Sequence, residues 1–67
     1  MGARPHYVVI DQTTEGEWFY EVRSGNNKAT DVSDYYKRKG TAVNLARTAY
    51  PKLTLREYVQ GRLINLL

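Results

Sequence analysis

The chain of 67 residues contains no cysteine, a single histidine and only two prolines. Without cysteine it can form neither a disulfide nor a thiolate metal site, and one histidine cannot build an imidazole cluster. A chain this short must then be stabilised by regular packing or by a partner subunit. We predict a single domain over residues 1–67, with no metal and no cofactor.

Long apolar runs are also missing. No stretch approaches the ~20 apolar residues that span a bilayer, and the first residues lack the apolar segment of a signal peptide. Hydrophobic residues nevertheless make up 42% of the chain and aromatic residues 12%, which is typical of a folded protein and not of a disordered one. We expect a cytoplasmic protein without membrane contact.

The two signs of charge are segregated along the chain. Residues 1–36, the acidic half, carry six acids and three bases, whereas residues 37–67, the basic half, carry seven bases and one acid. A basic side favours an acidic partner such as nucleic acid, an anionic lipid surface or an acidic protein. The same segregation permits head-to-tail association between unlike halves of two copies.

Three strands are predicted in the acidic half. Residues 7–11 are β-branched or aromatic except for the last, and residues 18–23 alternate between two faces at period two. The polar segment 12–16 suits a hairpin loop, and residues 24–27 read Ser-Gly-Asn-Asn, which is typical of a tight turn. Residues 28–32 can return as a third, antiparallel strand.

Two helices are predicted in the basic half. The first has apolar residues at helical spacing, begins near Arg38 and ends at residues 50–51, Tyr-Pro, with an earlier start at Ser33 as the alternative. The second begins at residues 54–57, Thr-Leu-Arg-Glu, which fit a capping box. We therefore predict an α+β fold with a three-stranded antiparallel sheet packed by one helix, plus a C-terminal helix.

The order of these elements resembles a known family. Residues 18–22 form an aromatic strand, a Gly-Asn-Asn turn follows, and a Tyr-x-x-Lys-x-x-Ala pattern enters the first helix at Tyr36, Lys39 and Ala42, after Ser33. Over about residues 7–50 this resembles the β-β-β-α unit of the domain-of-unknown-function family typified by the bacterial YegP protein. The resemblance implies a fold and association with a second unit, and it brings no catalytic residues.

A second resemblance is to the DNA-binding modules of tyrosine recombinases and to plant AP2-type domains, which also run three strands and a helix. The segment 37–42, Lys-Arg-Lys-Gly-Thr-Ala, is similar to their entry into the helix. In those modules the sheet lies in the DNA major groove. The sheet predicted here, with its first hairpin, is acidic, which counts against a DNA-reading sheet: Glu15, Glu17, Glu21 and Asp31.

The sharpest local feature is a run of three bases beside Tyr35 and Tyr36. Such a run can bind phosphates while an aromatic ring stacks on a base, although a solvated junction before a helix has the same composition. The residues predicted to bind nucleic acid are Lys37, Arg38, Lys39 and Arg47.

The C-terminal residues are strongly apolar. If they were exposed to solvent they would favour aggregation, so they either close the monomer core or pack against a second chain. We predict that they form a homodimer interface through Tyr58, Leu63, Ile64, Leu66 and Leu67.

No pattern in the chain predicts catalysis. There is no glycine-rich phosphate loop and no nucleophile motif, and the acids around the first hairpin are typical of a solvated strand face. We expect a small non-enzymatic binding or regulatory module of bacterial or phage type, acting as a homodimer on a host or cognate protein. The alternative is a nucleic-acid-binding protein that uses the basic half.

Overall fold

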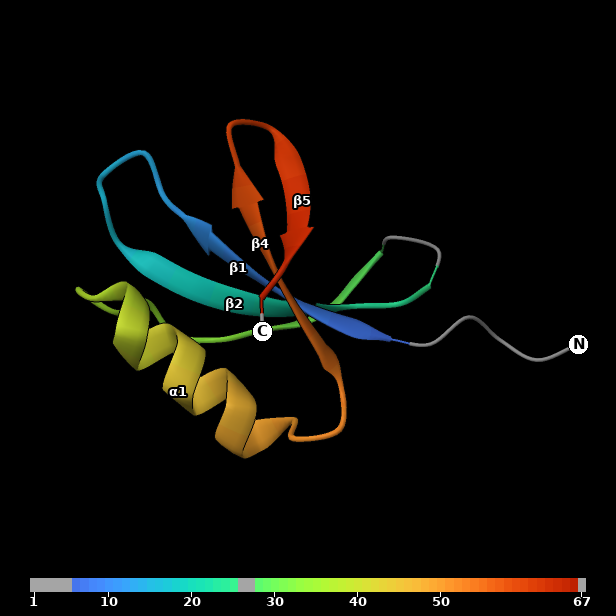
Figure 1. The fold of residues 1–67 in the computed structure, drawn as a ribbon. Helices are drawn as coiled ribbons and strands as arrows, with labels where there is room; N and C mark the ends of the chain where they lie inside the picture. The colour runs from blue at the N-terminus through green and yellow to red at the C-terminus, as the bar shows by residue number, and fades with distance from the viewer. Residues whose placement is uncertain (1–5, 26–27, 67) are drawn as a thin grey trace, which may run out of the picture.

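The computed structural model describes residues 6–25 and 28–66. Five strands form one mixed sheet in the order β3-β2-β1-β4-β5, and a single helix lies on one face of it (Figure 1). The elements are β1 (Tyr7–Gln12), β2 (Trp18–Arg23), β3 (Ala29–Val32), α1 (Lys39–Ala49), β4 (Thr54–Val59) and β5 (Arg62–Asn65).

The central strand is β1. It pairs antiparallel with β2, where Val8 lies opposite Val22, and parallel with β4, where Val8 lies opposite Leu55. The outer pairs β2–β3 and β4–β5 are antiparallel. Residues 7–10 are buried without a polar interruption, which is typical of a strand that has a parallel neighbour and is covered on both faces.

The three strands and the first helix predicted in residues 7–50 are confirmed, with shifts of one residue at most. The helix begins after Arg38, whose backbone is extended, and Tyr50 leaves the helical conformation directly before Pro51. Ala42 and Ala46 are buried one turn apart, so the backbone of α1 lies close to β1 and β2.

The predicted C-terminal helix is wrong, and so is the three-stranded sheet, because residues 54–65 form the hairpin β4–β5. Along β4, every second side chain lies on the α1 side of the sheet: Leu55, Glu57 and Val59. Some of these residues also fit a helical spacing, which is why a helix was predicted. Gln60 and Gly61 have φ values of 50° and 80°, as expected for a two-residue hairpin turn. The hairpin pairs the second edge of β1, which would otherwise be buried without hydrogen-bond partners.

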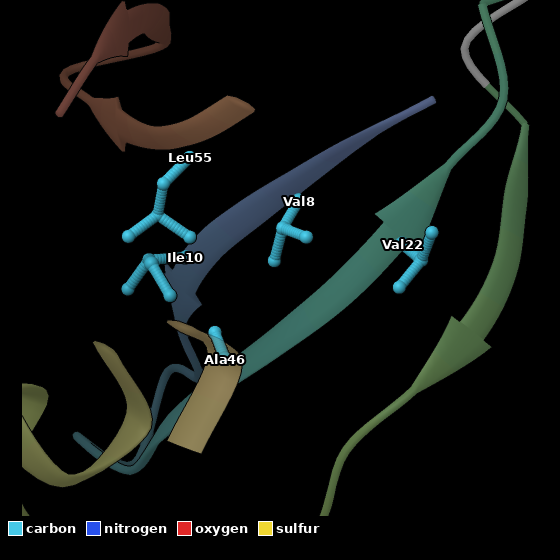
Figure 2. Close-up of a cluster of buried hydrophobic side chains, with 5 residues drawn as sticks. All are labelled: Val8, Ile10, Val22, Ala46 and Leu55. Carbon is cyan, nitrogen blue, oxygen red and sulfur yellow. The ribbon is translucent and has the colours of Figure 1, made fainter. Parts of the chain in front are cut away.

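The main core lies between α1 and the sheet (Figure 2). Val8 and Ile10 are fully buried, and Ala46 of the helix packs with them. Val22 from β2 and Leu55 from β4 complete the buried cluster. Half-buried side chains surround it: Trp18, Tyr20, Val43, Tyr50, Leu53 and Leu66.

No helix of residues 6–25 and 28–66 covers the opposite face of the sheet, yet Val9 on that face is fully buried. Arg23 Nη1 donates to Tyr58 Oη at 3.0 Å, and its guanidinium lies 5.1 Å from the centre of that ring. The guanidinium of Arg56 lies 4.4 Å from the centre of the Tyr7 ring. Stacked arginine and tyrosine side chains therefore cover this face in place of a second layer of secondary structure.

Candidate protein-association surface

The sheet ends at β3 on one side and at β5 on the other. A strand at the end of a sheet presents backbone N–H and C=O groups that its own sheet does not pair, and another chain can pair with them. Each of these two strands has four residues. We name them the β3 edge and the β5 edge.

The β5 edge is apolar and cationic on its α1 side. Ile64 lies opposite Glu57 of β4, and Glu57 lies beside Ile10 of the core. The side chain of Ile64 is therefore on the same side of the sheet as α1. Since α1 packs on β1 and β2, Ile64 stays 44% exposed. Val59 and Arg62 face each other across the hairpin on that same side, and both are exposed.

The hydrogen-bond ladder shows which backbone groups of β5 point outward. Leu66 donates its N–H to Leu55 O at 2.8 Å. Bonded and non-bonded pairs alternate in an antiparallel ladder, so the pairs Leu63–Tyr58 and Asn65–Arg56 are non-bonded. The N–H groups of Leu63 and Asn65 therefore point away from β4, toward the outer side of the sheet.

The β3 edge is acidic. Asp31 lies opposite Val22, hence on the α1 side of the sheet, and its Oδ2 accepts a hydrogen bond of 2.9 Å from Tyr50 Oη at the end of α1. This bond raises the pKa of the Tyr50 hydroxyl, with smaller contributions from burial and from the Asp31 charge. Val32 is exposed on the opposite face, and its N–H donates to Asp31 Oδ1 at 3.0 Å.

The basic run before α1 is divided by the fold. Lys39 Nζ forms an ion pair with Glu57 Oε1 at 2.6 Å and lies 5.8 Å from the centre of the Trp18 ring, so its position is fixed by protein contacts. Lys37 and Arg38 are exposed. Arg47 is exposed in the last turn of α1, about 12 Å along the helix axis from Lys39 at 1.5 Å per residue. The four residues predicted to bind nucleic acid therefore do not form one cluster.

The predicted interface residues are also separated. Tyr58 is half-buried and bonded to Arg23, and Leu66 is half-buried against the main core. Leu63 is half-buried on the face away from α1, whereas Ile64 remains exposed. Leu67 lies outside the described residues.

Sequence reasoning missed three residues of the two edges, Asp31, Val32 and Arg62, and also Val59 at the end of β4 beside the β5 edge. A signal for strand β4, on which β5 pairs, was present in the apolar run 7–10, because a strand buried on both faces needs a neighbour on each side. That neighbour had to come from the second half of the chain.

The segregation of charge persists across the folded sheet. Two ion pairs, Arg23–Glu21 and Lys39–Glu57, each join residues of the same half of the chain. The β3 edge carries Asp31 and the β5 edge carries Arg62, so the two ends of the sheet have opposite charge. Among residues 6–25 and 28–66, no group of three potential metal ligands lies together.

No helix in the described part of the chain is long and apolar enough to cross a membrane. Comparisons with protein-family models, with curated proteins and with solved structures return no match. The resemblance to the YegP-type family therefore stays a prediction.

Proposed function

We propose that this protein is a small non-enzymatic binding module that acts through protein–protein contacts as a homodimer, with the β5 edge in the contact. The observation that supports the proposal is an exposed edge strand with Ile64 and Val59 uncovered on its α1 side. Main-chain hydrogen bonds along such an edge give affinity, and the side chains beside it give specificity.

Size favours the same proposal. A chain of this length buries only about 60% of the surface that its unfolded form exposes, so burial at a subunit contact adds a large share of the total stability. Apolar surface removed from water contributes roughly 25 cal/mol per Å². The exposed parts of Ile64 and Val59 are the apolar surface next to an unpaired strand.

Sedimentation velocity over a wide range of protein concentration tests self-association. We expect a dimer that dissociates on dilution, and we expect Ile64→Lys to stay monomeric at concentrations where the parent protein is dimeric. Leu45→Lys is the matched control, because Leu45 is 41% exposed against 44% for Ile64 but lies on α1. A parent protein that is monomeric throughout, or equal loss in both variants, would contradict the proposed contact.

A second candidate function is nucleic-acid binding. Lys37 and Arg38 are exposed two and three residues after Tyr35, which is itself exposed and lies edge-on to Phe19 at 5.5 Å between ring centres. Exposed bases beside an aromatic ring are the combination that binds single-stranded nucleic acid without sequence preference.

Titration against labelled single-stranded and duplex DNA at several salt concentrations tests this candidate. On duplex, log K is expected to fall with log salt at a slope of about −0.9 per phosphate neutralised. Lys37→Ala combined with Arg38→Ala should reduce both the affinity and the slope, whereas Lys28→Ala combined with Lys52→Ala serves as a control of equal charge. No binding at low salt would eliminate this candidate.

A further inference from the structure

We propose that the two copies of the proposed homodimer join by pairing the β5 edge of one copy with the β3 edge of the other. One β3 edge and one β5 edge stay free in this dimer, so the same contact can repeat and continue the sheet into larger assemblies at high concentration. The inference rests on the proposed self-association and specifies the surface that meets the β5 edge. The partner is a second copy of the chain, and it contributes its β3 edge to the β5 edge of the first copy.

Strand direction favours this pairing. β3 runs parallel to β1, because both are antiparallel to β2. β4 is parallel to β1 and β5 is antiparallel to β4, so β5 runs opposite to β3. A second copy moved sideways, with its helix on the same side of the sheet, therefore presents β3 antiparallel to β5. Antiparallel strands can pair there without any turn of the second copy.

The side chains of the two edges then meet on matching faces. Asp31 is on the α1 side of β3, and Arg62 is on the α1 side of β5. In the continued sheet the acid of one copy and the base of the other therefore lie on the same face, and the proposed register is one that places them directly opposite or diagonal to each other. Opposite charges at such cross-strand positions stabilise a pair of strands, and like charges destabilise it.

The backbone of β5 and the other face agree with the same arrangement, while on β3 the Val32 N–H would exchange its bond to Asp31 Oδ1 for one to the second copy. Val32 and Leu63 lie on the face away from α1, so they become apolar neighbours across the contact. The N–H groups of Leu63 and Asn65 already point outward from β5. A contact between two β5 edges would instead bring two Arg62 side chains into one interface. The repulsion between these like charges favours pairing of the β5 edge with the β3 edge.

Charge reversal tests the pairing. We expect Asp31→Arg and Arg62→Glu each to weaken self-association roughly tenfold, because an opposite-charge pair becomes a like-charge pair. Mixing the two variants, or combining both changes in one chain, should restore association, since every contact then again joins an acid and a base. Lys52→Glu reverses a charge outside both edges and should leave the association constant unchanged.

A backbone variant gives an independent test. Asn65→Pro removes an outward N–H and should abolish association without loss of an internal strand bond, while Asn65→Ala should not. Asp31→Asn keeps an acceptor for Tyr50 and separates the charge effect from damage to the fold. If Asp31→Arg leaves the association constant unchanged, the β3 edge is not the partner and only this inference is lost. If the parent chain is monomeric at every concentration, the proposed homodimer is lost with it.

Discussion

Lys39 Nζ lies 2.6 Å from Glu57 Oε1, which joins the first residue of α1 to the middle of β4. The two side chains are buried to different degrees, since 9% of Glu57 is exposed against 42% of Lys39. The carboxylate depends on the lysine for its charge partner, whereas the lysine also reaches water. The two residues should therefore respond unequally to substitution.

Lys39→Met should lower the free energy of unfolding by about 1–3 kcal/mol, because it leaves a buried carboxylate without a cation. Glu57→Gln should lower it by less than half as much, since the freed lysine is solvated. Urea denaturation of both variants measures the difference. A larger loss in the glutamine variant would show that the carboxylate has another partner of equal strength.

The arginine and tyrosine side chains on the face away from α1 should contribute to the free energy of unfolding as buried core side chains do. Arg23 donates to Tyr58 and forms an ion pair with Glu21; burial lowers its pKa, but these two partners together raise it above the ordinary value. Arg23→Met should reduce stability by about 1–2 kcal/mol. Arg62→Met, at an exposed position, should change stability by less than about 0.5 kcal/mol. Thermal unfolding compares the two, and equal effects would contradict the structural role of Arg23.

Two glycines should respond in opposite directions to substitution by alanine. Gly61 has a φ of 80° in the β4–β5 turn, so Gly61→Ala should cost about 1–2 kcal/mol. Gly40 lies in the first turn of α1, where an added methyl group would have nothing within 4 Å, so Gly40→Ala should stabilise by about 0.5–1 kcal/mol. Denaturant midpoints of the two variants on either side of the parent value would confirm this prediction.

Alkaline pH should destabilise the protein through Tyr50. Its pKa is raised above the ordinary value of 10.0, first by the hydrogen bond to Asp31 and then by burial. The folded state then holds the proton more tightly than the unfolded state, so this stabilisation is complete below about pH 10 and is lost as the pH rises through the raised pKa. Tyr50→Phe should make stability fall less steeply above about pH 10. An unchanged slope would exclude this contribution.

Much of the fold could be predicted from sequence because local and tertiary preferences agree in residues 7–49. Trp18 to Arg23 alternate at period two and contain β-branched and aromatic residues, and they form β2 as predicted. Ala42 and Ala46 recur at helical spacing, and they are buried in α1.

The tail was mispredicted because its local signals favour one structure and its tertiary environment another. Thr54 and Glu57 fit a capping box, but β1 offers an unpaired edge that only an extended segment can use. Glu57 pairs with Lys39 in place of an N-terminal backbone group of a helix. Gly61, which weakens a helix, is at the position where the hairpin turns.

The candidate site could not be predicted because it depends on which strands end the sheet. Sequence indicated a basic run at residues 37–39, and the fold uses Lys39 of that run for an internal ion pair. The acid and the base of the two edges are 31 residues apart in sequence numbering, at Asp31 and Arg62, and nothing local to either position marks it as an edge.

The central position of β1 has a consequence for synthesis on the ribosome. β1 is made before the other four strands of this sheet, and β2 follows it at once, but its second neighbour β4 begins only at Thr54. Until β4 has emerged, the nascent chain displays an apolar strand with one open edge, the kind of segment that aggregates or recruits chaperones. The sheet is therefore completed only when a hairpin made more than 40 residues after β1 docks against it.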